Sequence, residues 1–481
     1  MKQAIRALRH RNFKLFFGGQ IISLVGTWMQ RIAMGWLVYR LTNSPFMLGA
    51  VGFAGQIPTF LLAPLGGVFA DRWDRRKVLV FTQTLAMVQA LVLSMLVLTG
   101  TVLIWHIFVL SIFLGVVNAW DMPVRQSFMI EMVEKKEDLS NAIALNSSMV
   151  NSARLLGPSL AGILIAAVGE GTCFLLNGIS YLAVIAALLA MNVAAKAPPR
   201  QGARIWSGLT EGFHYAFGFA PIWSLLLLLA LVSLMGMPYA VLMPIFAKEI
   251  LHGGPHTLGF LMGASGVGAI AGAVYLASRK SVLGLGKIIS IAASLFGLGL
   301  IAFSLSRLLG FSLMMMMVTG FGMIVAMAAS NTVLQTIVED DKRGRIMSFY
   351  TMTFMGMAPF GSLLAGFLAS RMGAPDTLLL GGIACLLGAA VFATRLRALR
   401  RQTQCGPAVQ AAVSAEQSRP MASQAASRPR SKRGSLKPGR QAREERSSET
   451  TSRAAADTAR KAATVKRAEH SISTASAPRR W

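Results

Sequence analysis

Charged residues are scarce in this chain. Only 14% of its 481 residues are Asp, Glu, Lys or Arg, whereas a water-soluble domain carries about 25%. Two long stretches, 45–70 and 78–103, hold no charged residue at all. Uncharged apolar runs of about 18 residues or more are typical of membrane-spanning helices. The shortage of charge therefore argues against a water-soluble globular protein and predicts a chain that crosses a bilayer.

Cysteine is also rare. The three cysteines, Cys173, Cys385 and Cys405, lie far apart, form no Cys-x-x-Cys pair and have no histidine at metal-ligand spacing. Neither a disulfide framework nor a metal site is predicted. A nucleotide-binding loop is missing as well, because the glycines within 263–272 lie inside an apolar run with no preceding strand. The chain is therefore expected to need no cofactor, to use no ATP, and to be no enzyme, with no catalytic residue.

Twelve apolar segments are long enough to cross a bilayer as helices. A helix of about 20 residues rises about 30 Å, which matches the hydrocarbon core, whereas a membrane barrel uses strands of about 10 residues. The predicted fold class is therefore an all-helical membrane protein with twelve spans. The expected spans are 13–39, 45–70, 78–99, 103–126, 140–168, 172–193, 222–247, 257–278, 284–305, 309–333, 346–370 and 376–396.

Lys and Arg are distributed unevenly between the two sides of this predicted bundle. With the N-terminus in the cytoplasm, the inner segments hold 21 Lys and Arg residues and the outer loops hold 4. Cytoplasmic loops of membrane proteins carry such an excess. An even number of spans then places both termini in the cytoplasm. The basic N-terminal stretch lacks a small-x-small cleavage site, so we expect no removable signal peptide and assign the chain to the cytoplasmic (inner) membrane.

The two halves of the chain repeat a pattern. Predicted span 5 holds Pro158 followed by Ser-Leu-Ala-Gly over 159–162, and predicted span 11 holds Pro359 followed by Ser-Leu-Leu-Ala-Gly over 362–366. A charged loop precedes each of these helices. Parallel six-span repeats are a known layout of transporters. The predicted domains are an N-terminal six-helix half over 1–193, a cytoplasmic linker over 194–221 and a C-terminal six-helix half over 222–399.

The remaining segment, 400–481, has a different composition. It holds 18 Lys and Arg residues against 6 Asp and Glu residues, and few large apolar side chains. Such a segment buries too little surface to fold alone, so a disordered basic tail is predicted. Two interpretations stay open: a solvated tail, or a tail attracted to anionic lipid headgroups. A nucleic-acid partner is not expected, because no aromatic residues are interleaved with the arginines.

A charge-dense turn over 66–77 joins the second and third predicted spans. It resembles the signature loop of the major facilitator superfamily of transporters, Gly-x-x-x-Asp-Arg-x-x-Arg-Arg/Lys, with Asp74 standing where many members have Gly. The resemblance implies a gating loop whose contacts bias inward-open against outward-open states. The alternative is that its cations only fix the topology. The gating residues implied by the resemblance are Gly67, Asp71, Arg72, Arg75 and Arg76.

Three charged residues, Arg31, Asp121 and Arg154, lie deep inside predicted spans, away from the span ends. Such residues are costly in lipid and mark a pathway or a partner. Each shares a helix face with other polar residues spaced three and four apart. We expect these faces to line an aqueous cavity for substrate and proton between the two halves; the alternative is structural ion pairs inside the bundle. The candidate cavity residues are Gln30, Arg31, Asn118, Asp121, Arg125, Asn151 and Arg154.

Further stretches resemble the exporter subgroup of this superfamily, which contains the enterobactin exporter and related drug-efflux carriers. The matching stretches are 118–128, Trp28 to Trp36, Phe174 to Tyr181 and 343–348. The stretch 154–162 resembles the antiporter motif of span 5, with alanine replacing two glycines. In that motif Gly157, Pro158 and Gly162 are expected to bend the helix and to permit close packing. The resemblance covers roughly residues 10–395 and not the tail.

These features together predict a proton-driven exporter of small molecules that works by alternating access. Asp121 is the candidate proton site, paired with Arg125 or Arg154. The two buried arginines would suit an anionic substrate such as a siderophore, and the hydrophobic lining would suit a drug. The expected partners of this monomer are a small-molecule substrate, H+ and membrane lipid. Two alternatives stay open: a lipid or lysolipid flippase on the same fold, and a non-transporting membrane scaffold.

Overall fold

The computed structural model describes residues 6–70, 73–133, 135–192, 220–279, 284–338 and 340–417. Regular structure within these ranges is entirely helical. Twelve helical spans are long and apolar enough to cross a membrane, which confirms the predicted all-helical fold class. The chain divides into two units, 1–405 and 406–481, and the first unit contains all twelve spans.

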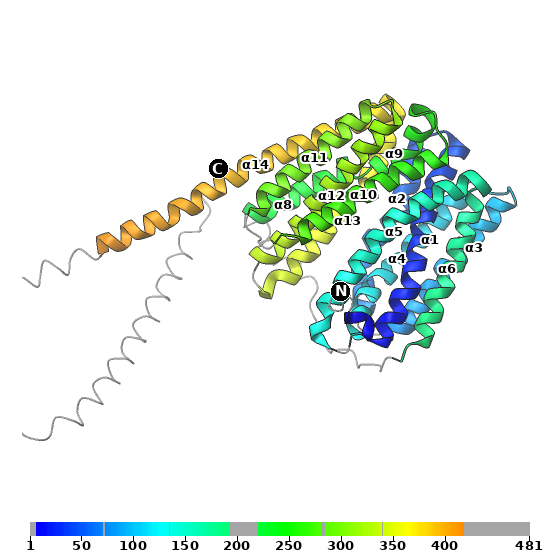
Figure 1. Cartoon of the computed structure of the whole chain (residues 1–481), viewed down its shortest axis with the longest axis horizontal. Helices are drawn as coiled ribbons and strands as arrows, with labels where there is room; N and C mark the ends of the chain where they lie inside the picture. Colours follow the sequence, from blue (N-terminus) through cyan, green and yellow to red (C-terminus); the bar gives the residue numbers. More distant parts are fainter. Residues whose placement is uncertain are drawn as a thin grey trace, which may run out of the picture. The chain divides into compact units, whose positions relative to one another are not determined.

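The first half of the bundle contains six long helices, and the second half contains the other six spans (Figure 1). The elements of the first half are η1 (Arg6–Arg9), α1 (Arg11–Thr42), α2 (Pro45–Ala70), α3 (Arg75–Leu98), α4 (Ile104–Glu131), η2 (Lys136–Asp138), α5 (Leu139–Val168) and α6 (Glu170–Ala190). Those of the second half are α8 (Ala220–Leu231), η3 (Val232–Gly236), α9 (Tyr239–Ile245), η4 (Phe246–Ile250), α10 (Pro255–Ala277), α11 (Leu285–Leu305), α12 (Leu309–Ile337), α13 (Asp340–Met372) and α14 (Ala374–Gln417).

The seventh span differs from the straight helix expected over 222–247. It runs through α8, η3, α9 and η4, and the two short elements η3 and η4 are π-helical turns. Pro238 and Pro244 both lie in this span, and proline supplies no backbone N–H for an intrahelical bond. A wider π turn accommodates such an interruption. The run Pro221–Ile250 still qualifies as one span.

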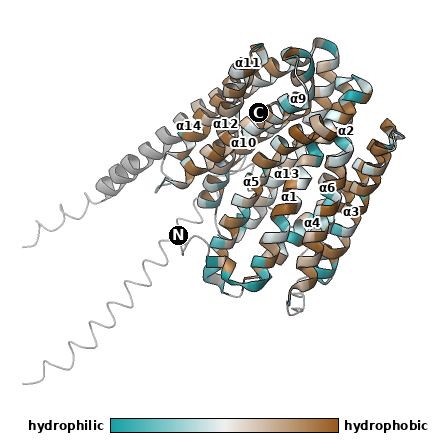
Figure 2. Cartoon of the chain, turned by 45° about the vertical axis from the view of Figure 1, so that its right-hand side comes forward, coloured by the Kyte–Doolittle hydropathy of each residue, from teal (hydrophilic) through white to brown (hydrophobic). Residues whose placement is uncertain are grey.

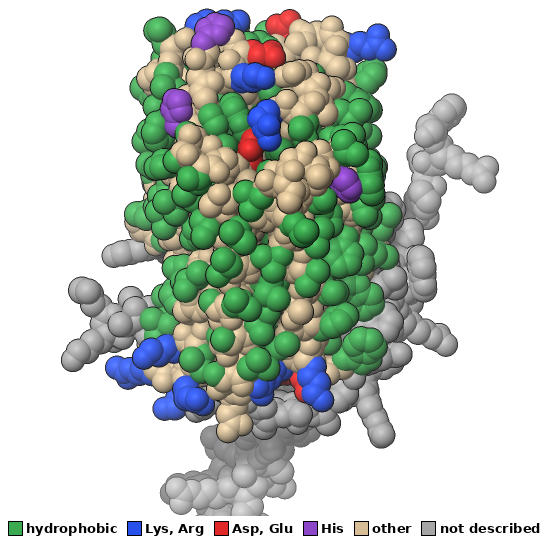
Figure 3. Space-filling model, turned by 90° about the vertical axis from the view of Figure 1, so that its right-hand side faces the viewer, with side chains coloured by type: hydrophobic (Ala, Val, Ile, Leu, Met, Phe, Trp, Pro, Cys, Tyr) green, Lys and Arg blue, Asp and Glu red, His purple; other side chains and the backbone are tan. Residues whose placement is uncertain are grey.

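The surface of the bundle explains the scarcity of charge. Figure 3 shows a broad belt of hydrophobic side chains between two ends where Lys, Arg, Asp and Glu gather, and the hydropathy colouring of Figure 2 follows the same division. Large apolar side chains such as Leu61, Phe81 and Met95 are exposed by 62%, 64% and 69%. In water these side chains would be a liability, whereas in a bilayer they contact acyl chains.

The two ends of the bundle are distinguished by the direction of α1. At the near end, where α1 begins, Asn12 bonds to Asn192 after α6. At the far end, where α1 ends, Arg40 pairs with Glu170 at the start of α6.

Within the first half α1 packs on α5 and α6, and α2 and α3 pack on α4. The two halves meet where α5 packs on α10 and where α2 packs on α13.

Two glycine crossings join the halves toward the far end. A Cβ built on Gly162 of α5 would lie 2.8 Å from the Cα of Gly259 of α10. A Cβ built on Gly366 of α13 would likewise lie 2.8 Å from the Cα of Gly49 of α2. Only glycine permits helices to approach so closely. Gly162 and Gly366 end the two repeated sequence patterns, so the repeat in the sequence corresponds to a repeated packing geometry.

Three of the predicted domain boundaries can be compared with the structure. The linker expected over 194–221 lies outside the described residues except at its end, where α8 begins at Ala220. The two halves belong to one unit, because α5–α10 and α2–α13 pack across the boundary between them.

Helix α14 continues past Arg400 to Gln417, into the segment expected to be disordered. Alanine, glutamine and arginine, which are frequent there, are strong helix formers. Residues 418–481 lie outside the described residues.

Candidate functional site

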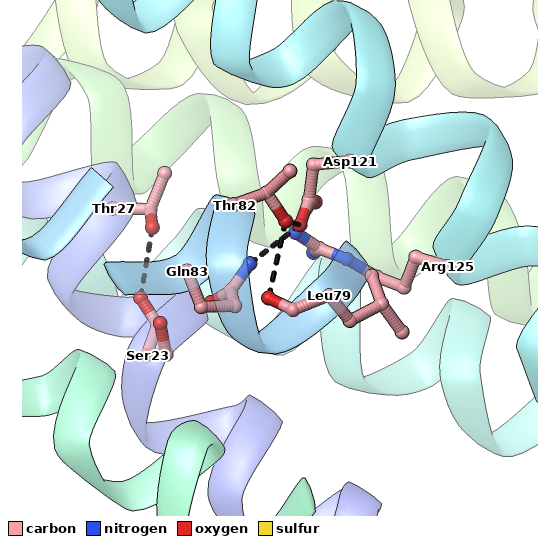
Figure 4. Close-up of polar contacts among 7 residues, drawn as sticks. All are labelled: Ser23, Thr27, Leu79, Thr82, Gln83, Asp121 and Arg125. Carbon is pink, nitrogen blue, oxygen red and sulfur yellow. Dashed lines mark hydrogen bonds and ion pairs between the residues drawn. The ribbon is translucent and has the colours of Figure 1, made fainter. Parts of the chain in front are cut away.

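Asp121 of α4 is buried, with 1% of its surface exposed. One carboxylate oxygen, Oδ1, accepts hydrogen bonds from Thr82 Oγ1 at 2.9 Å and from Gln83 Nε2 at 2.7 Å, both on α3. The other oxygen, Oδ2, pairs with Arg125 one turn along α4 (Figure 4). Both oxygens of the buried carboxylate therefore have partners, as a charge inside a helical bundle requires.

The sequence left two partners open for Asp121, and the structure pairs it with Arg125 rather than Arg154. Helical periodicity placed Asn118, Asp121 and Arg125 on one face of α4, and the structure turns the carboxylate on that face toward α3. The Asp121 carboxylate therefore lies within the first half of the bundle, instead of facing the second half. Thr82 and Gln83 were not among the predicted site residues, since the predicted span over 78–99 carries no charge to draw attention to them.

Gln30 of α1 also lies within the first half. Its side chain is 4% exposed; its Nε2 donates to Gln89 Oε1 on α3 at 3.0 Å, and its Oε1 accepts from Asn177 Nδ2 on α6 at 2.6 Å. The Gln30 amide thus connects three helices through buried hydrogen bonds. These bonds place the Gln30 side chain among α1, α3 and α6, and its role in lining the cavity stays a prediction.

The opposite face of α1 is turned to the second half. Gly35 lies against Pro244 of α9, with a Cβ built there 3.5 Å from the proline ring. Tyr39, one turn farther, bonds to Glu249 of η4. Arg31 lies one turn before Gly35 on this same face, and its side chain is exposed although it lies well inside the span. The Arg31 side chain is therefore not enclosed by the protein at this depth of the span.

Arg154 of α5 faces the same region. Its guanidinium Nη2 is 3.5 Å from Met323 Sδ of α12, a contact that crosses from the first half to the second. The guanidinium carbons of Arg154 and Arg31 lie 5.7 Å and 4.7 Å from the ring centroid of Trp28. Two arginines predicted from separate spans are thus brought together around one indole ring, which the sequence did not identify as part of the site.

Among the described residues, neither of these arginines has an acidic partner. In the described part of the chain, no ion pair includes Arg31 or Arg154. The helices that carry them, α1 and α5, contain no Asp or Glu. Arg125, Arg75 and Arg40, in contrast, each pair with a carboxylate. The free positive charge of the bundle interior is therefore concentrated at Arg31 and Arg154.

The other predicted residues of α5 support this arrangement. Gly157 packs on Trp28, since a Cβ built on Gly157 would lie 2.4 Å from the Trp28 Cβ. Pro158 is buried, one residue after Gly157. Asn151 Nδ2 donates to the backbone oxygen of Ser147 at 2.9 Å, so its side chain bonds within its own helix. Gly157 and Gly162 both lie at close helix contacts, and the cavity roles of Asn118 and Asn151 stay predictions.

The charged turn between α2 and α3 is only partly described. Asp71 and Arg72 lie outside the described residues, and Gly67 lies in the last turns of α2. Asp74 caps α3 by accepting hydrogen bonds from the backbone N–H groups of Arg76 at 3.0 Å and Lys77 at 3.3 Å. Aspartate at a helix N-terminus satisfies backbone donors that have no partner in the helix, which explains an Asp where glycine is usual.

The two arginines that follow in this turn contact α4 and α6 of the first half. Arg75 pairs with Glu131 at the end of α4. Arg76 donates to the backbone oxygen of Leu189 in α6 at 2.6 Å. These contacts fasten the start of α3 to the near end of its own half. The gating role of the turn stays a prediction.

A second cluster at the near end lies outside the spans. Asp138 of η2 bonds to His10 Nε2 at 3.0 Å and pairs with Arg6 of η1. The hydrogen bond from His10 and the charge of Arg6 hold the pKa of the Asp138 carboxyl below its usual range, although its burial acts in the opposite direction. This cluster ties the N-terminal turn to the connection between α4 and α5.

The far end carries polar contacts between the halves. Tyr39 donates to Glu249, and Lys248 Nζ donates to Asn43 Oδ1 at 2.8 Å. The Lys248 ammonium also lies 5.3 Å from the ring centroid of Tyr39. We call the contacts of Tyr39, Asn43, Lys248 and Glu249 the far-end link. Together with the two glycine crossings, the far-end link holds the halves against each other at this end.

Comparisons with known proteins agree with this fold. A sequence profile described as a transmembrane secretion effector matches residues 3–419. The staphyloferrin A transporter of Staphylococcus aureus (strain NCTC 8325 / PS 47) is 24% identical over 382 residues, which are 79% of this chain and 95% of that protein. Macrolide efflux protein A of Streptococcus pyogenes is 23% identical over 392 residues, covering 78% and 94%. The multidrug efflux pump Tap of Mycolicibacterium fortuitum is 24% identical over 379 residues, covering 76% and 92%.

Solved structures show the same fold at low sequence identity. The nucleoside transporter NupG superposes with a TM-score of 0.60 at 13% identity, over 82% of this chain and 99% of that one. An inward-facing, occupied bacterial homolog of the human lysosomal transporter Spinster superposes with a TM-score of 0.62 at 14% identity, over 81% and 97%. The architecture of these neighbours is that of the twelve-span bundle described above.

Proposed function

Because the chain belongs to the transmembrane secretion effector family of major facilitator transporters, we propose that it exports small molecules across the cytoplasmic membrane by proton-coupled alternating access. Its similarity to transporters of a siderophore, a macrolide and multiple drugs supports export as the direction. The proposed substrates are siderophore-like or drug-like molecules, and the proposed working unit is a monomer. Transport, rather than a chemical reaction, is the proposed activity.

The observation that carries this proposal is the exposed Arg31 on the face of α1 that is turned to the second half. A charged group at membrane depth is costly and is retained where it serves a pathway. A non-transporting scaffold has no use for such a group beside an accessible space. Arg31 and Arg154 therefore favour a transporter over the scaffold alternative.

The distribution of contacts supports an inward-facing state. The glycine crossings and the far-end link join the halves at the far end, while Ser147 and Ser148, toward the near end of α5, are exposed. We place the near end and both termini in the cytoplasm, since its loops carry the excess of Lys and Arg. In this arrangement a substrate reaches Arg31 and Arg154 from the cytoplasm. An exporter requires this access, because it loads its substrate on the cytoplasmic side.

Asp121 is the proposed proton site. Protonation of its carboxylate would remove the attraction to Arg125 and turn an acceptor of hydrogen bonds into a donor. The contacts with Thr82 and Gln83 would then rearrange, changing the packing of α3 on α4. We propose that the turn containing Gly67, Asp71, Arg72, Arg75 and Arg76 follows this change, since Arg75 and Arg76 fasten α3 at the near end.

Inside-out membrane vesicles test this proposal. Vesicles acidified internally by their own ATPase should lose part of the pH gradient when an exported compound is added. The reason is that each transport cycle carries protons out of the vesicle lumen in exchange for the compound. A panel of siderophores and antimicrobial compounds is the probe set, and empty-vector vesicles are the control. The Asp121→Asn variant should bind compounds but no longer dissipate the gradient.

Two results would contradict the proposal. Lipid movement between leaflets of proteoliposomes without a pH gradient, and without compound flux, would favour the lipid flippase. Flux of neither lipid nor compound by folded, purified protein would favour the scaffold.

A further inference from the structure

We infer that the substrate is an organic anion with an aromatic or apolar body, whose acid group binds to Arg31 and Arg154 while its body packs on Trp28. This inference rests on the proposed transport function and names the substrate class of that site. It follows from the charges, the aromatic geometry and the apolar wall of the region between the halves.

The charges around this region are unbalanced. Arg31 and Arg154 lie within contact range of one indole ring, at 4.7 Å and 5.7 Å from its centroid. Two cations this close repel each other, and the repulsion is strongest where water is scarce. In the described part of the chain no carboxylate pairs with either of them. An anionic ligand would supply the missing negative charge.

Comparison with the other arginines shows that this is a local property of the site. Arg125 pairs with Asp121, Arg75 pairs with Glu131, and Arg40 pairs with Glu170. At each of these three arginines the chain supplies a carboxylate as the partner of the guanidinium group. At Arg31 and Arg154 it supplies none, although α1 and α5 run through the same bundle. Guanidinium groups bind carboxylates in bidentate geometry, which suits an organic acid as the partner.

Trp28 provides a fixed planar surface between the two cations. Its side chain packs on Gly157, where a Cβ would approach the Trp28 Cβ to 2.4 Å. The ring is half-buried, so part of its surface stays open to a ligand. An aromatic body can stack on such a ring while its acid group bonds to the guanidinium groups beside it.

The second half contributes an apolar wall to the same place. Met323 of α12 contacts Arg154 with its sulfur at 3.5 Å, and α12 carries no charged residue along its length. Met323 itself is buried, with 1% of its surface exposed, so it supports Arg154 and the open apolar surface of the site is that of Trp28. Two cations beside an open aromatic ring favour amphipathic anions over cations.

Binding of three naphthalene compounds to purified full-length protein in detergent tests this inference. The probes are naphthaleneacetate, naphthylethanol and naphthylethylamine, which share an aromatic body and differ in charge. We expect the acid to bind at least about tenfold more tightly than the alcohol, a difference of about 1.4 kcal/mol, and the amine to bind most weakly. The readout is the ligand-induced shift in thermal unfolding, which rises with occupancy.

The matched variants are Arg31→Gln and Arg154→Gln, with Arg371→Gln as the control at an exposed arginine outside the site. Each of the first two should lower affinity for naphthaleneacetate about tenfold and leave affinity for the alcohol unchanged. The control should behave as the unmodified protein. Arg31→Lys, which keeps the charge, should retain part of the preference for the acid and covers the case in which Arg31→Gln does not fold.

Equal binding of the three probes, preference for the amine, or unchanged acid binding by both Arg31→Gln and Arg154→Gln would each overturn the inference. Its failure is distinguishable from failure of the proposed function. Proton-coupled export in vesicles, together with equal affinity for the acid, the alcohol and the amine, would overturn the anion site alone. Charge-selective binding together with no flux of any compound would support the anion site and overturn the transport function.

Discussion

Individual arginines in this protein have two kinds of surroundings. Arg125 is bound by a carboxylate one turn away on its own helix, whereas Arg31 and Arg154 share an aromatic ring and have no acid beside them in the described residues. A buried charge that keeps a fixed partner stabilises one packing arrangement, while a charge without a partner is available to a ligand. The difference separates structural from transport residues at the scale of single side chains.

The Asp121–Arg125 pair gives a prediction about stability. Removing one member leaves an unpaired buried charge, which costs about 3–5 kcal/mol. Arg125→Gln should therefore lower the unfolding temperature more than the double variant Asp121→Asn with Arg125→Gln, in which both charges are absent. Thermal unfolding in detergent, followed by tryptophan fluorescence, measures this order.

The control for this comparison is the Arg40–Glu170 pair, in which Arg40 is 50% exposed. Exposed pairs contribute about 1 kcal/mol or less, so Arg40→Gln should have a small effect. An Arg125→Gln variant as stable as Arg40→Gln would contradict the structural importance of the buried pair.

Asp138 gives a prediction about pH. Its pKa in the folded protein is held below the usual range by the hydrogen bond from His10 and the charge of Arg6. The unfolded chain then binds its proton at the higher pKa, about 3.9. The stabilisation is therefore complete above about pH 4 and is lost as pH falls through the folded pKa.

Asp138→Asn removes this ionisation, so the gap in unfolding temperature between it and the unmodified protein should be constant above about pH 5 and should narrow below about pH 4. His10→Phe removes the hydrogen bond that is the first cause of the lowered Asp138 pKa. Asp138→Asn should therefore change the unfolding temperature less at neutral pH when His10→Phe is also present. A gap that widens on acidification would mean that the carboxyl has no depressed pKa.

Helix crossings are the features that matter at the scale of elements. Helices α5 and α10 meet at Gly162 and Gly259, and helices α2 and α13 meet at Gly49 and Gly366. At both crossings a Cβ built on one glycine would lie 2.8 Å from the Cα of the facing glycine. Gly162 and Gly366 occupy the same position in the two copies of the sequence repeat. Because backbones touch there, a small sideways shift at each crossing moves a whole helix.

Valine at either repeat position is predicted to separate the halves. Gly162→Val or Gly366→Val places side-chain atoms where a Cβ alone would be 2.8 Å from the facing Cα, and overpacking of this kind costs about 1–3 kcal/mol. Both variants should populate a state opened at the far end and lose most export activity. Spin labels at Leu41 and His252, which are exposed at the far end, measure the separation by pulsed electron paramagnetic resonance.

Gly18→Val is the matched control, because a Cβ at that position of α1 meets nothing within 4 Å. It should leave both the distance distribution and the export activity unchanged. Unchanged distances in Gly162→Val and Gly366→Val would show that the crossings do not hold the far end closed.

At the scale of the whole molecule, the two halves are joined at one end by a few polar side chains and two crossings. The far-end link uses one tyrosine, one asparagine and the adjacent residues Lys248 and Glu249. The hydrogen bonds of the far-end link can stabilise one conformation and still be broken, because each is worth only about 1 kcal/mol. Alternating access needs this balance.

Breaking the far-end link should shift the conformational equilibrium toward opening at this end. Glu249→Gln and Tyr39→Phe each weaken the same hydrogen bond, so each should increase the open population severalfold, consistent with about 1 kcal/mol. The double variant should add little to either single change, since members of one contact are not additive. The same pair of spin labels measures this population, with Arg307→Gln, at an exposed position outside the link, as the control.

Additive effects of Glu249→Gln and Tyr39→Phe would show that the two residues act through different partners. No change in either variant would show that the glycine crossings alone keep the far end closed.

The sequence by itself determined the number of spans, the helical fold and the repeat of the halves. These follow from uncharged runs about 20 residues long, because a backbone in lipid must satisfy its own hydrogen bonds. It also identified Arg31 and Arg154, since charge inside a span is conspicuous. The π-helical turns of the seventh span were missed, because they depend on how proline is accommodated rather than on hydrophobicity.

Only the tertiary structure decided which polar faces meet. Periodicity assigns a side chain to a face of its helix but does not say which helix that face contacts. Gln30 and Arg31 are neighbours in sequence, yet one bonds to α3 and α6 and the other faces the second half. Asp121 is directed to α3 by Thr82 and Gln83, two residues without charge. The rotation of each helix about its axis, set by packing at glycines and buried amides, is what the linear chain does not display.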